Sequence, residues 1–260
     1  MTWKEDSIHH VFFEPGCWSP LAKALTAFAE GDKGAVLEVH VDSGEADPLP
    51  VSLFFRSPSE LRDEDRIALD HVKGRVLDLG AGVGSVTLAL QGLGFEVTAL
   101  EVIPEAVGIM AERGVRDARK GRLEDLATGE VFDTILVLMN GIALAGSLGG
   151  VPGFLRALRN RLEEGGQILL DSTNLLEEPS APAAADQELP PEWFEGEYPG
   201  EAHYQLEFRG ERGAPFPQVF VDPATLAILA KREGLDMEVV WRGDEGAFLA
   251  RLRVRRDSRI

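Results

Sequence analysis

The sequence has a single cysteine, few basic residues for its acid content, and no long apolar run. Cys17 alone cannot form an intramolecular disulfide, so we expect a cytoplasmic location. The absence of a secretory signal and of an apolar run of membrane-spanning length predicts no membrane partner. With 44 acidic residues against 26 Lys and Arg, the formal net charge is −18, which disfavours binding to nucleic acid. The same excess of acid is also compatible with a high-salt environment.

The chain is long enough for one large domain, or for one domain with an appendage. We expect residues 1–57 to form an N-terminal extension, with a helix at residues 19–29 and a hairpin of two strands at 35–41 and 51–55. Residues 58–260 then form the main domain, beginning with a helix at residues 59–72. The adjacent His9 and His10 have no supporting ligand residues, so we predict no metal site there.

A glycine-rich turn between an apolar strand and a helix stands at residues 76–85. Its pattern is D-x-G-x-G-x-G, with Asp78 before the glycines and Ser85 after them. Glycine allows positive φ and a close approach of the backbone to a ligand, and the first amides of the next helix point into the same cleft. Dinucleotide-binding loops instead have the spacing G-x-G-x-x-G. The Asp78 carboxylate would repel a pyrophosphate and attract a cationic group.

Two further strand ends carry polar residues. Glu101 follows the strand predicted at residues 95–100, where a carboxylate suits the two hydroxyls of a ribose, although it could also cap the helix that begins at Pro104. Asn140 and Gly141 follow the apolar run at 132–139. Asn140 could orient a substrate through its amide or serve as a turn residue.

The last third of the chain contains an acidic insertion and a closing hairpin. Residues 171–201 contain nine acids, five prolines and no Lys or Arg, so we predict a mobile lid insertion at about 172–201 over the cleft. Its aromatic residues, Trp193, Phe194 and Tyr198, could close on an apolar or cationic substrate. The final strands, at 237–241 and 247–254, are joined by five residues, which is too short for a crossover helix, so the pair is antiparallel.

From about residue 74 to 254, the chain resembles class I S-adenosylmethionine-dependent methyltransferases, in particular uncharacterised bacterial members. The Asp78–Gly84 loop, Glu101 and the strand ending at Asn140 carry the resemblance. It implies an α/β fold: a Rossmann-like seven-stranded mixed sheet with an antiparallel last strand. It also implies S-adenosylmethionine as cofactor, transfer of its methyl group by in-line displacement, and a small-molecule acceptor.

The resemblance further implies a cofactor site at the strand ends, made of Asp78, Gly80, Ala81, Gly82, Gly84, Glu101, Val102, Leu123, Glu124, Met139 and Asn140. Where the family often has an Asp near the adenine, this chain has Arg122, which has no acceptor atom. Glu124, Asp125 or the Leu123 backbone could take its place. Candidates for a catalytic role are Asn140, His203 and Tyr204, with Glu197 as a further possible base.

Two other classes of protein remain open at this stage. A non-catalytic S-adenosylmethionine-binding or regulatory protein would keep the loop but need no base, and the Arg122 departure favours it. A nucleotide-dependent oxidoreductase would use the same loop and Glu101, but the glycine spacing, Asp78 and the terminal hairpin disfavour it. The oligomeric state has no signature in the sequence.

Overall fold

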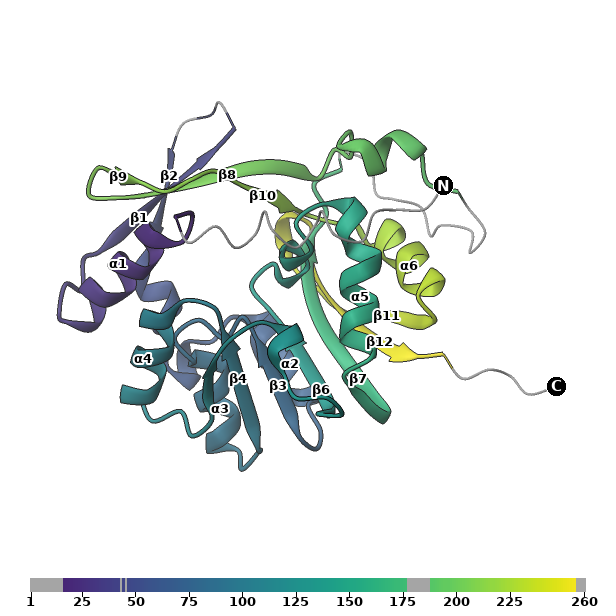
Figure 1. The fold of residues 1–260 in the computed structure, drawn as a ribbon, viewed down its shortest axis with the longest axis horizontal. Helices are drawn as coiled ribbons and strands as arrows, with labels where there is room; N and C mark the ends of the chain where they lie inside the picture. The colour runs from purple at the N-terminus through teal and green to yellow at the C-terminus, as the bar shows by residue number, and fades with distance from the viewer. Residues whose placement is uncertain (1–15, 43, 45, 177–187, 256–260) are drawn as a thin grey trace.

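The computed structural model describes residues 16–42, 44, 46–176 and 188–255. His9 and His10 lie outside these residues. Two sheets and six α-helices make up the described part of the chain (Figure 1). None of the helices in these ranges is long and apolar enough to cross a membrane.

The larger, central sheet has seven strands in the order β11-β12-β7-β6-β3-β4-β5. Six of them point in the same direction, and β12 alone runs opposite to them, antiparallel to both of its neighbours. This confirms the predicted mixed sheet with an antiparallel last strand. The strands are β3 (Val76–Leu79), β4 (Val97–Glu101), β5 (Ala118–Lys120), β6 (Phe132–Val137), β7 (Leu162–Thr173), β11 (Leu235–Arg242) and β12 (Ala247–Val254).

Helices cover both faces of the central sheet because its inner strands are apolar on both faces. One face, which includes Val76, Val97 and Leu136, packs against α2 and α3. The other, which includes Leu77 and Ile135, packs against α5 and α6. The helices are α2 (Asp63–His71), α3 (Ser85–Gly92), α4 (Pro104–Glu112), α5 (Val151–Arg159) and α6 (Pro223–Arg232).

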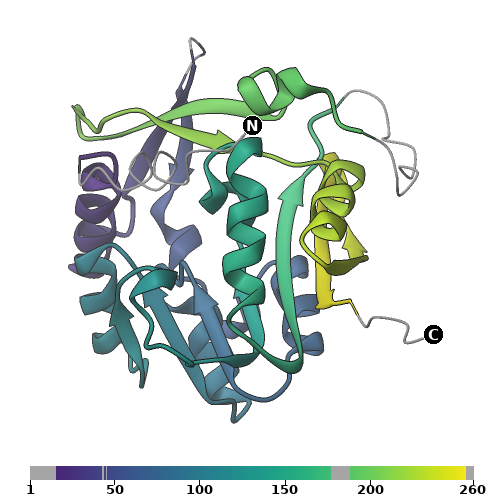
Figure 2. The ribbon, with the colours of Figure 1, turned by 45° about the vertical axis from the view of Figure 1, so that its right-hand side comes forward.

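A second sheet, which we call the roof sheet, contains β10-β8-β1-β2, with the short β9 paired to β8. It joins the N-terminal hairpin to the chain that follows β7, through antiparallel pairing of β1 with β8. Figures 1 and 2 show it across the top of the molecule, above the central sheet. Its strands are β1 (Val36–Val41), β2 (Ala46–Pro50), β8 (Glu201–Phe208), β9 (Glu211–Arg212) and β10 (Phe216–Val219).

Helix α1 (Ser19–Ala29) connects the roof sheet to the rest of the fold. Its buried residues, including Leu25 and Phe28, share an apolar core with Leu37 of β1, Leu206 of β8 and Ile109 of α4. The predicted helix at 19–29 is therefore present, and it ties the roof to the side of the central sheet. The proposed division of the chain near residue 57 stays a prediction.

Two local predictions near the N-terminus were wrong. The second strand of the hairpin is Ala46–Pro50 and not 51–55, where the chain forms a 3₁₀ turn at Val51–Phe54. Pro48 and Pro50 argue against a strand at residues 46–50, because proline has no N–H to donate. However, β2 is an edge strand, where a missing N–H is tolerated. The helix predicted at 59–72 is a 3₁₀ turn at Pro58–Glu60 followed by α2.

The lid was predicted at about residues 172–201, and residues 177–187 of this segment lie outside the described ranges. The described remainder includes a 3₁₀ turn at Pro191–Glu195 and packs on the main core. Tyr198 is only 2% exposed, and its hydroxyl donates to Asp222 Oδ2 at 2.9 Å and accepts from the Asp222 amide at 3.0 Å. The prediction that Tyr198 contacts a substrate was therefore wrong, because its hydroxyl holds the insertion to the start of α6.

We predict that Tyr198→Phe lowers the free energy of unfolding by about 1–3 kcal/mol, because it removes the hydrogen-bond partner of the Asp222 amide and of Asp222 Oδ2, while Oδ1 still caps α6. Urea denaturation measures the change. Tyr204→Phe is the matched control, since the hydroxyl of this second tyrosine makes no hydrogen bond within the described residues, and we expect a change within about 0.5 kcal/mol. Equal losses in the two variants would contradict the role of the Asp222 contact.

Candidate active site

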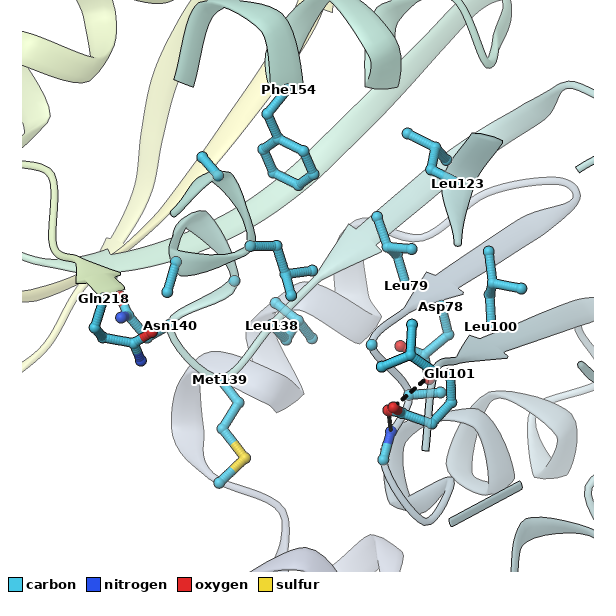
Figure 3. A pocket seen from close by; sticks show the side chains of 18 of the residues that line it. Asp78, Leu79, Leu100, Glu101, Leu123, Leu138, Met139, Asn140, Phe154 and Gln218 are labelled. Carbon is cyan, nitrogen blue, oxygen red and sulfur yellow. Dashed lines mark hydrogen bonds between the residues drawn. The ribbon is translucent and has the colours of Figure 1, made fainter. Parts of the chain in front are cut away.

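A cavity of about 1350 Å³ lies between the carboxyl ends of β3, β4 and β6 and the roof sheet. The carboxyl edge of a parallel sheet is where ligands bind in folds of this type. Figure 3 shows Asp78 and Glu101 on one side of the cavity and Asn140 and Gln218 on the other. The cavity exceeds the range of about 300–1,000 Å³ that is typical of a single small-molecule site.

The glycine-rich turn forms the part of the wall below Glu101. Gly80, Gly82 and Gly84 all have positive φ, at 74°, 56° and 83°. Gly84 is also required by close packing, since a Cβ there would lie 2.7 Å from Val115 Cγ2. Gly80 and Gly82 line the cavity, whereas Gly84 packs behind the turn at the start of α3. The turn thus presents backbone to the cavity without side chains in the way.

The Glu101 carboxylate holds the turn and the end of β4 together. Oε2 accepts from the Gly82 amide at 2.9 Å, and Oε1 accepts from the amides of Val102 at 2.7 Å and Ile103 at 3.0 Å. Burial raises the pKa of Glu101, although the three amides act in the opposite direction. A carboxylate has about four acceptor positions, so Glu101 can still accept a hydrogen bond from a ligand in the cavity.

Asp78 lies at the end of β3 and is 4% exposed. Its Oδ2 accepts a hydrogen bond from Thr87 Oγ1 of α3 at 2.5 Å. Burial raises the pKa of Asp78 to about 6, and the nearby carboxylates of Asp65 and Glu101 add to the increase. A cation in the cavity would favour the ionised form of Asp78 and would be bound more tightly by it.

A group of charged residues from the segment before the central sheet also lines the cavity, and the sequence analysis missed it. Asp65, 1% exposed, pairs with Arg62 at 2.7 Å and with Arg56 Nη1 at 3.8 Å. The Arg56 Nε is buried and has no hydrogen-bond partner in the described chain, and burial lowers the pKa of this guanidinium. Arg113 donates to the Arg56 carbonyl oxygen at 3.5 Å. The charged residues of this segment are visible in the sequence and could have indicated a site. Their ion-pair partners, however, depend on the fold.

The cofactor-site residues predicted from the sequence come together in this cavity. All except Gly84 line it: Asp78, Gly80, Ala81, Gly82, Glu101, Val102, Leu123, Glu124, Met139 and Asn140. Arg122 lines it too, whereas Asp125 accepts from the Arg122 amide at 2.8 Å and caps a 3₁₀ turn. Asp125 therefore does not replace the missing acid.

The catalytic candidates divide between the cavity and the surface. Asn140 and Tyr204 line the cavity, but the His203 side chain is 70% exposed, lies outside it, and is 3.7 Å from Asp42. Adjacent residues of a strand point to opposite faces, so a roof strand that turns Tyr204 inward turns His203 outward. The suggestion of His203 was wrong, and the exposed Glu197 does not line the cavity either.

The apolar side of the cavity comes from the roof sheet and α1. Its residues are Trp18, Leu21, Leu37, Val39, Leu49, Tyr204, Leu206 and Phe216. The alternation of apolar residues on the strands at 36–41 and 201–208 was visible in the sequence. Their pairing, and thus the shared face, was not, because the two segments lie more than 150 residues apart.

Comparisons with known proteins agree with this geometry. A model of the methyltransferase domain family matches residues 55–238. The chain is 30% identical over 182 residues to a ubiquinone biosynthesis O-methyltransferase of Xanthomonas euvesicatoria pv. vesicatoria (strain 85-10), covering 66% of each chain, so it spans about two thirds of the length of this curated relative.

Solved structures extend the similarity to nearly the whole chain. The crystal structure of a SAM-dependent methyltransferase from Bacteroides fragilis in complex with S-adenosyl-L-homocysteine has a TM-score of 0.80 and 33% identity, covering 93% of this chain and 97% of that one. The CcbJ methyltransferase of Streptomyces caelestis has a TM-score of 0.56 at 18% identity, covering 77% of this chain and 93% of that one, and shares the fold.

We predict that Asp78→Asn becomes more stable relative to the wild type as pH rises. The raised pKa of Asp78 means that the folded state binds more protons than the unfolded state between pH about 4 and 6, so the wild type loses stability as pH rises through this window. The difference in free energy of unfolding should grow by about 1 kcal/mol between pH 5 and pH 7.

Urea denaturation of the ligand-free protein at several pH values gives this difference directly. Asp70→Asn, which removes a carboxylate from an exposed position of α2, is the control for the loss of charge. A difference between Asp78→Asn and wild type that is constant with pH, or that shrinks as pH rises, would contradict the raised pKa.

Proposed function

We propose a small molecule as the methyl acceptor of this chain, which belongs to the family of class I S-adenosylmethionine-dependent methyltransferases and uses S-adenosylmethionine as its methyl donor. The curated relatives that it matches include small-molecule O-methyltransferases by name. What supports the proposal is the cavity of this protein.

The observation that carries the proposal is the size and division of the cavity. Its volume of about 1350 Å³ leaves room for a second ligand beside the donor. The wall nearest the central sheet carries carboxylates and arginines, whereas the wall formed by the roof sheet is mainly apolar. A covered apolar chamber suits a small organic molecule. The net charge of −18 disfavours nucleic acid as an acceptor. We also propose a cytoplasmic location.

For the donor, we assign each polar group of the cofactor to the residues whose chemistry matches it. Glu101 would accept from the ribose hydroxyls, and Asp78 would attract the cationic amino-acid part. Arg56, whose Nε is buried and has no hydrogen-bond partner in the described chain, would pair with the carboxylate of the cofactor's amino-acid group. The glycine turn would allow the backbone to approach the ligand, and Leu123 and Glu124 would border the adenine.

When bound, S-adenosylmethionine supplies a methyl group already activated by its sulfonium. The protein then has to bring the acceptor into line with that methyl group and keep water out of the chamber. Met139 and Asn140, which follow β6, line the cavity, with Asn140 on the side opposite to Asp78 and Glu101. They border both ligands in this arrangement.

Transfer of a radiolabelled methyl group tests the proposal. The purified protein is incubated with labelled S-adenosylmethionine and an extract of the source cells, which is then separated into low-molecular-mass and macromolecular fractions. We expect the label in the low-molecular-mass fraction, and none with heat-inactivated protein. Label that enters only nucleic acid or protein would overturn the small-molecule acceptor.

We predict that Glu101→Ala weakens binding of S-adenosylhomocysteine by about ten- to a hundredfold, since hydrogen bonds to a charged acceptor contribute about 1.5–3 kcal/mol. Calorimetric titration measures the affinity, and circular dichroism checks the fold. Glu96→Ala, at an exposed acid just before the same strand, should bind as the wild type does. NAD should give no binding heat. Unchanged affinity in Glu101→Ala would remove Glu101 from the site.

We also predict that Arg56→Gln reduces the preference of the protein for ligands with a carboxylate. The probes are S-adenosylhomocysteine and methylthioadenosine, which lacks the amino-acid group. The ratio of their affinities should fall by about tenfold in the variant, with methylthioadenosine itself little affected. Arg66→Gln, an exposed arginine of α2, is the control. An equal loss for both ligands would assign Arg56 a structural role.

A further inference from the structure

The wall that the roof strands contribute to the cavity is apolar except at two positions. Among the described residues of these strands that line the cavity, only Tyr204 of β8 and Gln218 of β10 have polar side chains. The others are Leu37, Val39, Leu49, Leu206 and Phe216. A few polar groups in an otherwise apolar site commonly fix the orientation and identity of a ligand. What these two groups contact therefore bears on the acceptor.

Neither polar group is occupied by the protein itself. The Tyr204 hydroxyl and both amide atoms of Gln218 make no hydrogen bond within the described residues. The side-chain nitrogen and oxygen atoms that are buried without a partner in these residues belong to three arginines and Asn140. Since Tyr204 and Gln218 are not among them, their unpaired polar atoms keep accessible surface. Both residues are partly exposed and line the cavity, so a ligand there can reach them.

The pairing of β8 with β10 places the two groups on one face of the roof sheet. Tyr204 lies opposite Phe216, and Ala202 lies opposite Gln218. Residues directly opposite one another, and residues two apart on one strand, share a face. Tyr204 and Gln218 are therefore diagonal neighbours at about 7–8 Å, a separation that aromatic and long side chains can bridge. A single group of a ligand can contact both.

Aromatic packing fixes the ring of Tyr204. The ring meets Phe216 edge to face with the centroids 6.3 Å apart, and its centroid lies 6.1 Å from that of Phe220. Phe216 in turn packs against Trp18, with centroids 4.7 Å apart. A ring held by its neighbours presents its hydroxyl at a defined place, and little side-chain freedom is lost when a ligand binds.

Both groups are uncharged, and each can donate and accept. Burial raises the pKa of Tyr204, and the carboxylates of Asp47 and Asp42 add to the increase, so the phenol keeps its proton. The Gln218 amide donates through its nitrogen and accepts through its oxygen. The two acids disfavour an anion near Tyr204. Neither acid lines the cavity, so a cation there would lack a direct counter-charge.

We propose that Tyr204 and Gln218 form a recognition subsite for an uncharged group of the methyl acceptor that both donates and accepts hydrogen bonds, such as a carboxamide or a hydroxyl. The inference rests on the proposed function, because the subsite belongs to the second ligand of the same cavity. Gln218 lies on the side of the cavity opposite to Asp78 and Glu101 (Figure 3). The subsite therefore selects the acceptor away from these two carboxylates, and its two residues determine specificity.

Four small probes with the same phenylethyl group test the inference on the complex with S-adenosylhomocysteine. Hydrocinnamamide has a donor and an acceptor, methyl hydrocinnamate has only acceptors, hydrocinnamate is an anion and phenylpropylammonium is a cation. Ligand-observed NMR titration gives their affinities. We expect the wild type to bind the amide about tenfold more tightly than the ester, and both ions more weakly than the amide.

Gln218→Met is the informative variant, because methionine has a similar length without the amide, and the backbone pairing of β10 does not involve the side chain. The preference for the amide over the ester should fall to less than about threefold, while the affinity for S-adenosylhomocysteine changes by less than about threefold. Tyr204→Phe should weaken binding of the amide by about threefold to tenfold.

Gln205→Met is the matched control. Gln205 neighbours Tyr204 on β8 and so points to the opposite face of the roof sheet, where its amide donates to the Gly213 carbonyl oxygen at 2.9 Å. It does not line the cavity. This variant should keep the wild-type preference for the amide.

The inference fails if the wild type binds the amide and the ester equally, binds either ion most tightly, or binds no probe up to its solubility limit. It also fails if Gln218→Met keeps the wild-type preference, if Tyr204→Phe keeps the wild-type affinity for the amide, or if Gln205→Met loses the preference as well. An equal loss of S-adenosylhomocysteine affinity in Gln218→Met would assign this residue to the donor. If the wild type does not bind S-adenosylhomocysteine at all, the proposed function fails first, which is a separate result.

Discussion

The antiparallel pairing of β1 with β8 is the interaction on which the site depends. It runs from Glu38 opposite Glu207 to Val41 opposite Tyr204 and joins segments at opposite ends of the sequence. Without it, the carboxyl edge of the central sheet would be an open crevice with charged residues facing water. With it, the apolar faces of both strands close over that edge and leave a covered cavity. The pairing of β1 with β8 thus converts an open edge of the central sheet into a covered cavity.

Buried carboxylates at the strand ends are concentrated on the central-sheet side of the cavity. Asp78 lies near the end of β3, Glu101 ends β4 and Asp171 lies near the end of β7, and burial raises the pKa of each. Glu101 and Asp171 are satisfied by backbone amides and Asp78 by a hydroxyl, so the protein keeps acceptors in the core without leaving them unpaired. The charged residues of the cavity thus lie on the side of the central sheet, and the wall formed by the roof sheet is mainly apolar.

The secondary-structure elements that were predicted correctly have local sequence patterns. The glycine turn, the strand ending at Glu101 and the terminal hairpin are local patterns within about 25 residues, and each appeared where it was expected. The hairpin strand at 51–55 was misplaced by a few residues, since prolines at 48 and 50 weakened the local signal for β2. His203 and Tyr198 were misjudged for a different reason. Which side of a strand or turn faces the cavity depends on its partners, and a single sequence does not specify them.

The sequence by itself determined the family, the donor and the polar strand ends of the cavity, because these depend on residue types at fixed short spacing: a carboxylate, three alternating glycines and a second carboxylate after the next strand. Only the tertiary structure decided the apolar wall of the cavity. The shared apolar face of β1, β8 and β10 arises from pairing across more than 150 residues. The Asn140 amide nitrogen donates to a carbonyl of β10, and the backbone beside it donates to a carboxylate of β7, and these groups meet only when both sheets are complete. Hydrogen bonding and burial at that point are properties of the assembled fold.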